Sequence, residues 1–153
     1  MLHIAAHGLA DERSPLRSAL FLGAGRATGE DGVLRMGEVL DLDLDSDLVV
    51  LSGCETGRGR LLRSEGALGF SWAFLSAGAS TVAVSLWNVN DRATSELMVA
   101  FYQQIMGGPE GREPKALAEA MALAKRTMLA SERRAYRHPY YWAPFVLIGA
   151  ANR

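Results

Sequence analysis

The segment of residues 47–57 (D-L-V-V-L-S-G-C-E-T-G) constrains the fold of this chain more than any other. It contains an unbroken apolar run at residues 48–51, which is typical of a parallel strand covered on both faces. Gly53 and Gly57 bracket a turn directly after this run, and the turn carries Cys54, the only cysteine of the chain. Ligands of open α/β sheets bind beyond the carboxyl ends of parallel strands. The thiol of Cys54 is therefore a candidate for chemistry, although free cysteines are more often buried and inert.

Strands and helices alternate along the rest of the chain. Short apolar stretches predict strands, and apolar residues at helical spacing predict helices. Strands are expected at residues 2–6, 81–87 and 140–149, and helices at residues 65–77, 90–106 and 115–134. Strands that alternate with helices of this length predict an α/β fold with a mostly parallel sheet and helices on both faces.

Smaller features complete this prediction. A hairpin with a Gly-rich tip is expected over residues 19–34, followed by one helical turn at residues 36–40. Pro144 cannot donate a hydrogen bond to a neighbouring strand, so the last strand is expected at an edge of the sheet. In the helix of residues 65–77, four apolar residues at helical spacing are expected to face the core. They are Leu68, Trp72, Phe74 and Leu75.

Composition limits the classes of function. The 153 residues suffice for one domain. The hydrophobic content of 49% argues against a disordered tail, and the net charge of −1 argues against nucleic-acid binding. A single cysteine excludes an intrachain disulfide and a multi-cysteine metal site, which suits the reducing cytoplasm. Residues 1–7 lack the basic start and long apolar middle of a signal peptide, and no apolar run approaches the roughly 18 residues that a membrane span needs, so neither is expected. We expect a cytoplasmic protein that binds neither membrane nor cofactor.

A histidine follows the first predicted strand much as the cysteine follows the strand of residues 47–51. Because the carboxyl ends of adjacent parallel strands meet at one sheet edge, His7 and Cys54 are expected to lie close together. An imidazole can accept a thiol proton or stabilise the thiolate. The amide of Gly8 can donate to the oxygen that becomes negative in a tetrahedral intermediate, which is worth roughly 3 kcal/mol of barrier. The alternative is a buried His7 whose ring is satisfied by the backbone.

Other motifs fail on inspection. His3 and His7 have the i, i+4 spacing of a helical zinc site, but they lie in a predicted strand and no Glu follows His3. An EF-hand loop counted from Asp41 has serine where its glycine and its final glutamate belong. Residues 57–62 lack the third glycine of a dinucleotide fingerprint, and residues 69–73 lack the last glycine of a nucleophile elbow. No metal site is therefore expected.

Five motifs in this order resemble those of the CHAT family of caspase-like cysteine peptidases, relatives of separase and the caspases that are often joined to tetratricopeptide repeats. They are A-A-H-G-L at 5–9, D-L-V-V-L-S-G-C-E-T-G at 47–57, E-G-A-L-G-F at 65–70, V-S-L-W-N-V-N-D at 84–91 and H-P-Y-Y-W-A-P-F-V-L-I-G at 138–149. The resemblance covers nearly the whole chain. It implies a caspase-like three-layer sandwich, a catalytic dyad of His7 and Cys54, and an oxyanion hole formed by the backbone amides of Gly8 and Cys54.

The resemblance also gives Asp91 a role. Its position in the V-S-L-W-N-V-N-D motif is similar to that of the acidic residue that receives a basic P1 side chain in separase. A carboxylate that meets Arg or Lys gives charge-assisted recognition, which makes this role physically reasonable. The alternative is that Asp91 only caps the helix predicted to start there, because aspartate is favoured at that position whatever the substrate.

The chain departs from the family pattern at its front, where CHAT domains usually have further strands and helices before the histidine strand. Residues 1–153 are therefore expected to form a single CHAT domain that lacks its N-terminal part. The missing strands would leave an apolar edge beside residues 2–6 unpaired. We expect an upstream domain, a tetratricopeptide-repeat region, a partner chain or an oligomer to complete the sheet.

The sequence thus predicts a cysteine endopeptidase, a regulatory protease of bacterial type, that cleaves protein or peptide substrates after a basic P1 residue. The alternative is a catalytically silent caspase-like module for protein interaction or regulation, because a fold does not guarantee activity. The loop of residues 58–63 contains Arg58, Arg60 and Arg63 and is a candidate self-cleavage site or simply a solvated loop.

Overall fold

A four-stranded sheet forms the middle of the protein. The computed structural model describes residues 1–9, 11, 13–23, 31–52, 64–87, 90–107 and 113–150. The sheet consists of β1 (Leu2–Ile4), β5 (Val49–Leu51), β6 (Thr81–Ser85) and β7 (Phe145–Gly149), in the order β1-β5-β6-β7. The first three strands are parallel, and β7 is antiparallel at the edge. The mostly parallel sheet and the edge position of the last strand are both confirmed.

Both faces of this sheet are buried, as the apolar runs predicted. Val49 and Val82 are fully buried against the side of the sheet that carries Phe70 and Phe74, whereas Val50 belongs to the cluster on the opposite side. Successive residues of a strand point to opposite faces, so an unbroken apolar run serves two cores at once.

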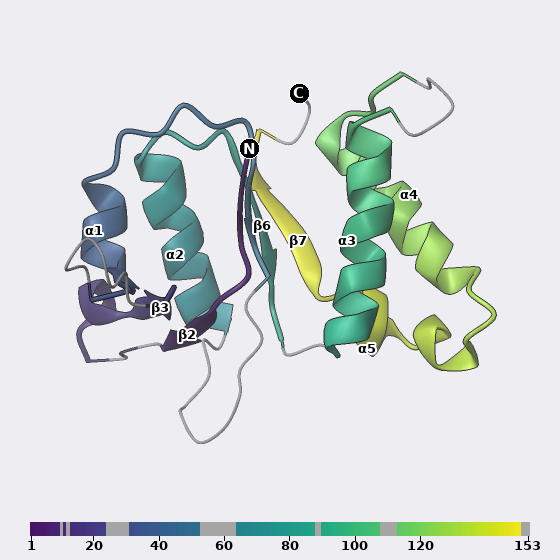
Figure 1. Ribbon diagram of the computed structural model, residues 1–153, viewed down its shortest axis with the longest axis horizontal. Helices are drawn as coiled ribbons and strands as arrows, with labels where there is room; N and C mark the ends of the chain where they lie inside the picture. Colours follow the sequence, from purple (N-terminus) through teal and green to yellow (C-terminus); the bar gives the residue numbers. More distant parts are fainter. Residues whose placement is uncertain are drawn as a thin grey trace.

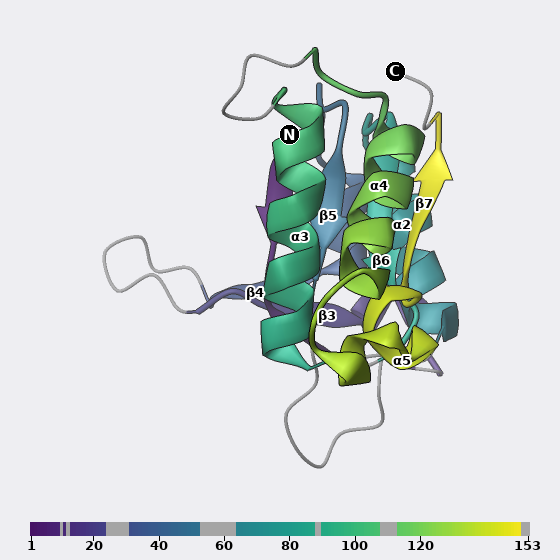
Figure 2. The ribbon, with the colours of Figure 1, turned by 90° about the vertical axis from the view of Figure 1, so that its right-hand side faces the viewer.

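Helices cover the two faces, which makes the protein a three-layer α/β sandwich (Figure 1). The helices α1 (Met36–Leu40) and α2 (Ser64–Ser76) lie on one face. The helices α3 (Asp91–Ile105) and α4 (Leu117–Leu129) lie side by side on the other (Figure 2). The 3-10 helix η2 (Arg134–Arg137) and the short helix α5 (Pro139–Trp142) follow α4 on that side. No helix among the described residues is long and apolar enough to cross a membrane.

A second, smaller sheet lies beside α1 and α2. It contains β2 (His7–Leu9), β3 (Ala19–Phe21) and β4 (Val33–Arg35), all antiparallel, with the 3-10 helix η1 (Pro15–Arg17) between β2 and β3. The predicted hairpin is confirmed by the pairing of β3 with β4, although its tip at residues 24–30 lies outside the described residues.

The first predicted strand is divided between the two sheets. β1 ends at Ile4, where the amide of Ser52 donates to the Ile4 carbonyl, and the chain then crosses to β2. His7 therefore does not end a strand of the parallel sheet but begins a strand of the small one, and Gly8 pairs with Leu20 there. The prediction of one strand over residues 2–6 that finishes at His7 was wrong.

Two further expectations were wrong. The face of α2 that packs on the sheet contains Phe70 and Phe74, whereas Trp72 is 64% exposed and Leu68 is 38% exposed. The last predicted strand begins only at Phe145, because α5 occupies residues 139–142 with a proline in its first turn and the His138 ring accepting the Tyr140 amide.

A glycine allows the sharp turn after α2. Gly78 has φ = +108°, and a Cβ at this position would collide with the carbonyl of Leu44. Only glycine fits both conditions, so the chain can turn sharply from α2 into β6.

Candidate functional site

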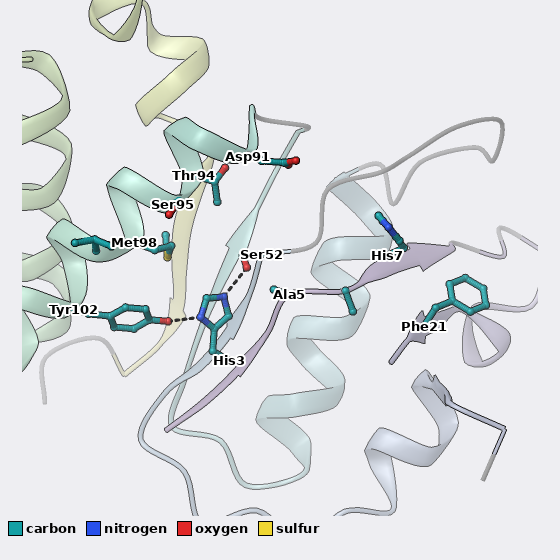
Figure 3. A pocket seen from close by; sticks show the side chains of 12 residues that line it. His3, Ala5, His7, Phe21, Ser52, Asp91, Thr94, Ser95, Met98 and Tyr102 are labelled. Carbon is teal, nitrogen blue, oxygen red and sulfur yellow. Dashed lines mark hydrogen bonds between the residues drawn. The ribbon is translucent and has the colours of Figure 1, made fainter. Parts of the chain in front are cut away.

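A pocket of about 550 Å³ lies between α3 and the segment that connects β1 to β2 (Figure 3). Its residues come from four parts of the chain that are far apart in sequence. They are His3, Ala5, Ala6 and His7 from the first segment, Phe21 from β3, Ser52 after β5, and Asp91, Thr94, Ser95, Met98, Val99 and Tyr102 from α3. The α3 residues recur at intervals of three and four and so form one face of the helix.

The pocket extends along most of α3. His3 contacts Tyr102, which lies in the last turns of α3, whereas Asp91 is the first residue of that helix. An α-helix rises about 1.5 Å per residue, so Asp91 and Tyr102 lie roughly 16 Å apart along the axis. The pocket is therefore elongated, with His3 and Tyr102 toward one end and His7 and Asp91 toward the other (Figure 3).

Asp91 lines the pocket without being the cap of its helix. The cap is Asn90, whose side-chain oxygen accepts hydrogen bonds from the amides of Arg92 (3.1 Å) and Ala93 (3.3 Å). Asp91 occupies the next position and is exposed. Its carboxylate still benefits from the partial positive charge at the helix N-terminus, but it is not needed to satisfy the first amides.

His7 is exposed and lines the pocket from β2. The alternative of a buried histidine at a strand end therefore does not hold. The same pocket contains both His7 and Asp91, which are far apart in the sequence. Gly8 follows His7 within β2, and the role of its amide stays a prediction. Cys54 lies outside the described residues, as do Gly53 and the basic loop of residues 58–63.

The opposite end of the pocket contains a hydrogen-bonded group that sequence reasoning missed. The Nε2 atom of His3 lies 2.5 Å from the hydroxyl oxygen of Ser52, and its Nδ1 atom lies 2.8 Å from the hydroxyl oxygen of Tyr102. The rings of His3 and Tyr102 are also in contact, with centroids 5.7 Å apart. One imidazole thus joins β1 to α3 and to the end of β5.

Partial burial changes the acid–base properties of this group. Loss of solvation lowers the pKa of His3 below its ordinary value of about 6.5, because burial disfavours the charged imidazolium. Burial likewise raises the pKa of the Tyr102 phenol, because it disfavours the phenolate. At neutral pH His3 is therefore neutral, with one ring nitrogen as donor and the other as acceptor.

Sequence patterns could have indicated only part of this site. His3 drew attention through its spacing to His7, but a zinc site was rejected and no other partner was evident. Ser52 is in the same run as Cys54, and parallel pairing of β1 with β5 places His3 opposite Val50, on the same face as Ser52. Correct strand pairing would therefore have suggested the contact between His3 and Ser52, whereas nothing local points to Tyr102.

A mostly parallel sheet between two helical layers, with a pocket beyond the ends of its first strands, defines a caspase-like α/β sandwich. The chain belongs to the CHAT domain family, because the model of that family matches residues 1–150. It is also similar to the tetratricopeptide repeat protein 28 of mouse and of human, with 36% identity over 118 residues in each case. The match covers 77% of this chain but only 4% of the length of each relative.

Proposed function

We propose that this CHAT domain is a cysteine endopeptidase that cleaves peptide bonds after a basic residue. The observation that carries the proposal is that His7 and Asp91, from different elements, line the same pocket. In this mechanism His7 is the general base and acid, Cys54 the nucleophile, and Asp91 the group that selects the substrate side chain.

The position of Ser52 supports the role of Cys54. Ser52 lines the pocket, and two residues of chain span at most about 7 Å, so a thiol two positions further along is within reach. The Cys54 sulfur would attack the substrate carbonyl carbon after its proton passes to His7. The resulting oxyanion would accept a hydrogen bond from the Gly8 amide, and His7 would return the proton to the leaving amine. Water would then hydrolyse the thioester.

Asp91 gives the proposed enzyme its preference for a basic side chain. The carboxylate lies in the pocket and is not engaged as the cap of α3, so it is available to a guanidinium or an ammonium. A hydrogen bond to a charged group contributes about 1.5–3 kcal/mol, and Arg can form two of them with one carboxylate.

The experiment is intact-mass analysis after incubation with an arginyl peptidyl acyloxymethyl ketone, which traps a nucleophilic thiol next to a formed pocket. The wild-type protein should gain one adduct at Cys54, and Cys54→Ala and His7→Ala should gain none. His138→Ala is the matched histidine control, because His138 caps α5 outside the pocket. A folded wild-type protein that stays unlabelled at Cys54 would contradict the proposal.

A non-catalytic interaction module is the second candidate. Within the described residues β1 pairs only with β5, so one edge of the sheet is open to another strand. Trp72, which is 64% exposed on α2, adds apolar surface on the other side of the molecule. The absence of any adduct in a protein that binds a partner would favour this candidate.

The two relatives suggest what lies next to this domain in the complete assembly. The two curated relatives are named for tetratricopeptide repeats, and this chain matches a small part of each. We therefore propose that a tetratricopeptide-repeat region, in the same polypeptide or in a partner chain, lies beside this domain in the complete assembly. A longer polypeptide that contains both should have a more stable CHAT domain than residues 1–153 alone.

A further inference from the structure

The hydrogen-bonded group of His3, Ser52 and Tyr102 has the geometry of an activated hydroxyl. The Ser52 oxygen lies 2.5 Å from Nε2 of His3, and Nδ1 of the same ring lies 2.8 Å from the Tyr102 oxygen. A nucleophile hydrogen-bonded to a base, with the base oriented by a third group, is the arrangement that nucleophilic catalysis requires.

The tautomer of His3 determines which group donates the proton in each of its two hydrogen bonds. With the proton on Nδ1, His3 donates to the Tyr102 oxygen, and Nε2 accepts the hydroxyl proton of Ser52. Burial disfavours the charged imidazolium, and in this tautomer of the neutral ring Nε2 has a lone pair available for the proton of Ser52.

The hydroxyl is also accessible to a ligand. Ser52 is half-buried and lines the pocket of about 550 Å³ together with the exposed His3. Ala5 and Met98 contribute apolar surface to the same space (Figure 3), and Val99 also lines it. The pocket can therefore hold an apolar acyl group next to the Ser52 oxygen.

We propose that Ser52 and His3 form a second nucleophilic site, which reacts with aryl esters and other activated acyl or phosphonyl groups, with Tyr102 as the positioning residue. This site uses neither Cys54 nor His7 nor Asp91. It therefore stands or fails independently of the proposed peptidase activity.

The reaction has two steps. The Ser52 oxygen attacks the ester carbonyl carbon while its proton moves to Nε2 of His3. The C–O bond to the aryl group then breaks, and the released phenolate takes the proton from His3 to become a phenol, which restores the neutral imidazole. Water then attacks the acyl-serine ester with His3 as base, and the carboxylic acid leaves as the serine regains its proton. Aryl esters fit because a phenolate departs without prior protonation, so the site needs no general acid at the leaving group.

A fluorophosphonate tests the first step directly. The Ser52 oxygen displaces fluoride from phosphorus, and the adduct is stable enough for intact-mass analysis and peptide mapping. The experiment uses the Cys54→Ala protein, so that the thiol cannot react. We expect one adduct on the peptide that contains Ser52, and hydrolysis of p-nitrophenyl butyrate that Ser52→Ala removes.

Matched variants separate a catalytic His3 from a structural one. His3→Gln can still hydrogen-bond but cannot accept a proton, so the labelling rate should fall at least about 100-fold. Ser76→Ala changes an exposed serine of α2 that does not line the pocket and should label at the unaltered rate. If His3→Gln does not fold, the pH profile replaces it, because the labelling rate of Cys54→Ala should rise through a pKa below about 6.5 and then stay constant.

Three results would overturn the proposal. They are the absence of an adduct on Ser52 in the folded Cys54→Ala protein, an equal rate of Ser52 labelling in His3→Gln, and a labelling rate that does not change with pH below 6.5. The group would then be a structural connection between β1 and α3 alone.

Discussion

The two ends of the pocket are built in different ways. At the His3 end, hydrogen bonds of 2.5 Å and 2.8 Å join side chains from β1, from the residue after β5 and from α3. At the other end, His7 extends from the small sheet and Asp91 from the start of α3. The side chains at the first end are therefore fixed by hydrogen bonds between elements, whereas His7 and Asp91 are exposed on the elements that carry them.

This difference has a testable consequence. Substitutions at the His3 end should lower the free energy of unfolding, because they remove contacts between elements of the fold. Substitutions at the His7 end should change reactivity and lower stability less than those at the His3 end, because both residues are exposed on their elements.

The largest expected effect is that of His7→Ala on the labelling of Cys54. Loss of a general base typically slows a reaction by about 10² to 10⁴-fold, so the rate of inactivation by the arginyl acyloxymethyl ketone should fall by that factor. The melting temperature should remain within about 2 °C of wild type, since surface substitutions change stability by less than about 0.5 kcal/mol. If His7→Ala clearly lowers the melting temperature as well as the labelling rate, the contrast between the two ends of the pocket is wrong.

The next effect is that of Asp91→Asn on the choice of substrate side chain. The carboxylate is replaced by an isosteric amide, so the preference for an arginyl over a leucyl probe should fall by about 10 to 100-fold. Stability should change by less than about 1 kcal/mol, because Asn90 still caps α3 and only the interaction with the helix dipole is lost. The ratio of inactivation rates with the two probes is the measurement.

Glu96→Gln is the matched control for Asp91. Glu96 is a carboxylate of the same helix that pairs with Arg92 at 3.2 Å and does not line the pocket. Its removal should leave the preference for arginine intact. An equal loss of preference in both variants would mean that the general negative charge of α3, and not Asp91 itself, selects the probe.

Sequence alone could predict the central sheet but not the division of the first strand. Val49 and Val82 belong to apolar runs that indicate strands buried on both faces, and the structure confirms them. The switch from β1 to β2 has no such signal, because residues 4–6 are all apolar and nothing in this run shows that β1 ends at Ile4. Helix α2 is apolar nearly all round, so periodicity could not show that Trp72 faces solvent while Phe74 is buried.

The candidate site was predictable only where its signals are local. Asn90 and Asp91 are both good capping residues, so the sequence indicated a helix start but could not say which of them caps it. His3 finds its partners 49 and 99 residues away, and contacts of that kind depend on the packing of three elements. The residue type of His7 and the family resemblance at Asp91 suggested the roles that we propose, and the fold was needed to place both residues in one pocket.

A smaller effect is expected for Tyr102→Phe on stability. The substitution removes the hydrogen bond to Nδ1 of His3 but keeps the ring, so the free energy of unfolding should fall by about 0.5–1.5 kcal/mol. Urea denaturation would show this as a lower midpoint with an unchanged slope. Labelling of Cys54 should stay within about twofold of wild type. A tenfold loss of Cys54 labelling without loss of stability would show that Tyr102 acts on the proposed peptidase site and not on the stability of the fold.

The control for Tyr102 is Tyr140→Phe. Tyr140 is 42% exposed on α5 and does not line the pocket, and we expect its hydroxyl to contribute little to stability. The difference in unfolding free energy between Tyr102→Phe and Tyr140→Phe isolates the part that belongs to the His3 group. A difference near zero would show that the hydrogen bond between Tyr102 and His3 does not stabilise the fold.

The smallest effect is the response of stability to pH through His3. Burial lowers the pKa of His3 in the folded protein, so between that pKa and about 6.5 the unfolded chain binds more protons than the folded one. Stability should therefore rise with pH across this window and be lowest below it. Ser52 and Tyr102 contact the ring directly, and His7 and Asp91 line the same pocket, so His3→Gln is needed to assign the change.

Thermal unfolding from pH 5 to pH 7.5 measures this dependence. Wild type should melt at a lower temperature at pH 5 than at pH 7.5, and His3→Gln should show a smaller decrease, because glutamine does not titrate. The remaining decrease in His3→Gln would belong to other groups, including His7 and the carboxylates. If both proteins lose the same amount of stability on acidification, the His3 ring is hydrated in the folded protein. Burial would then not lower its pKa.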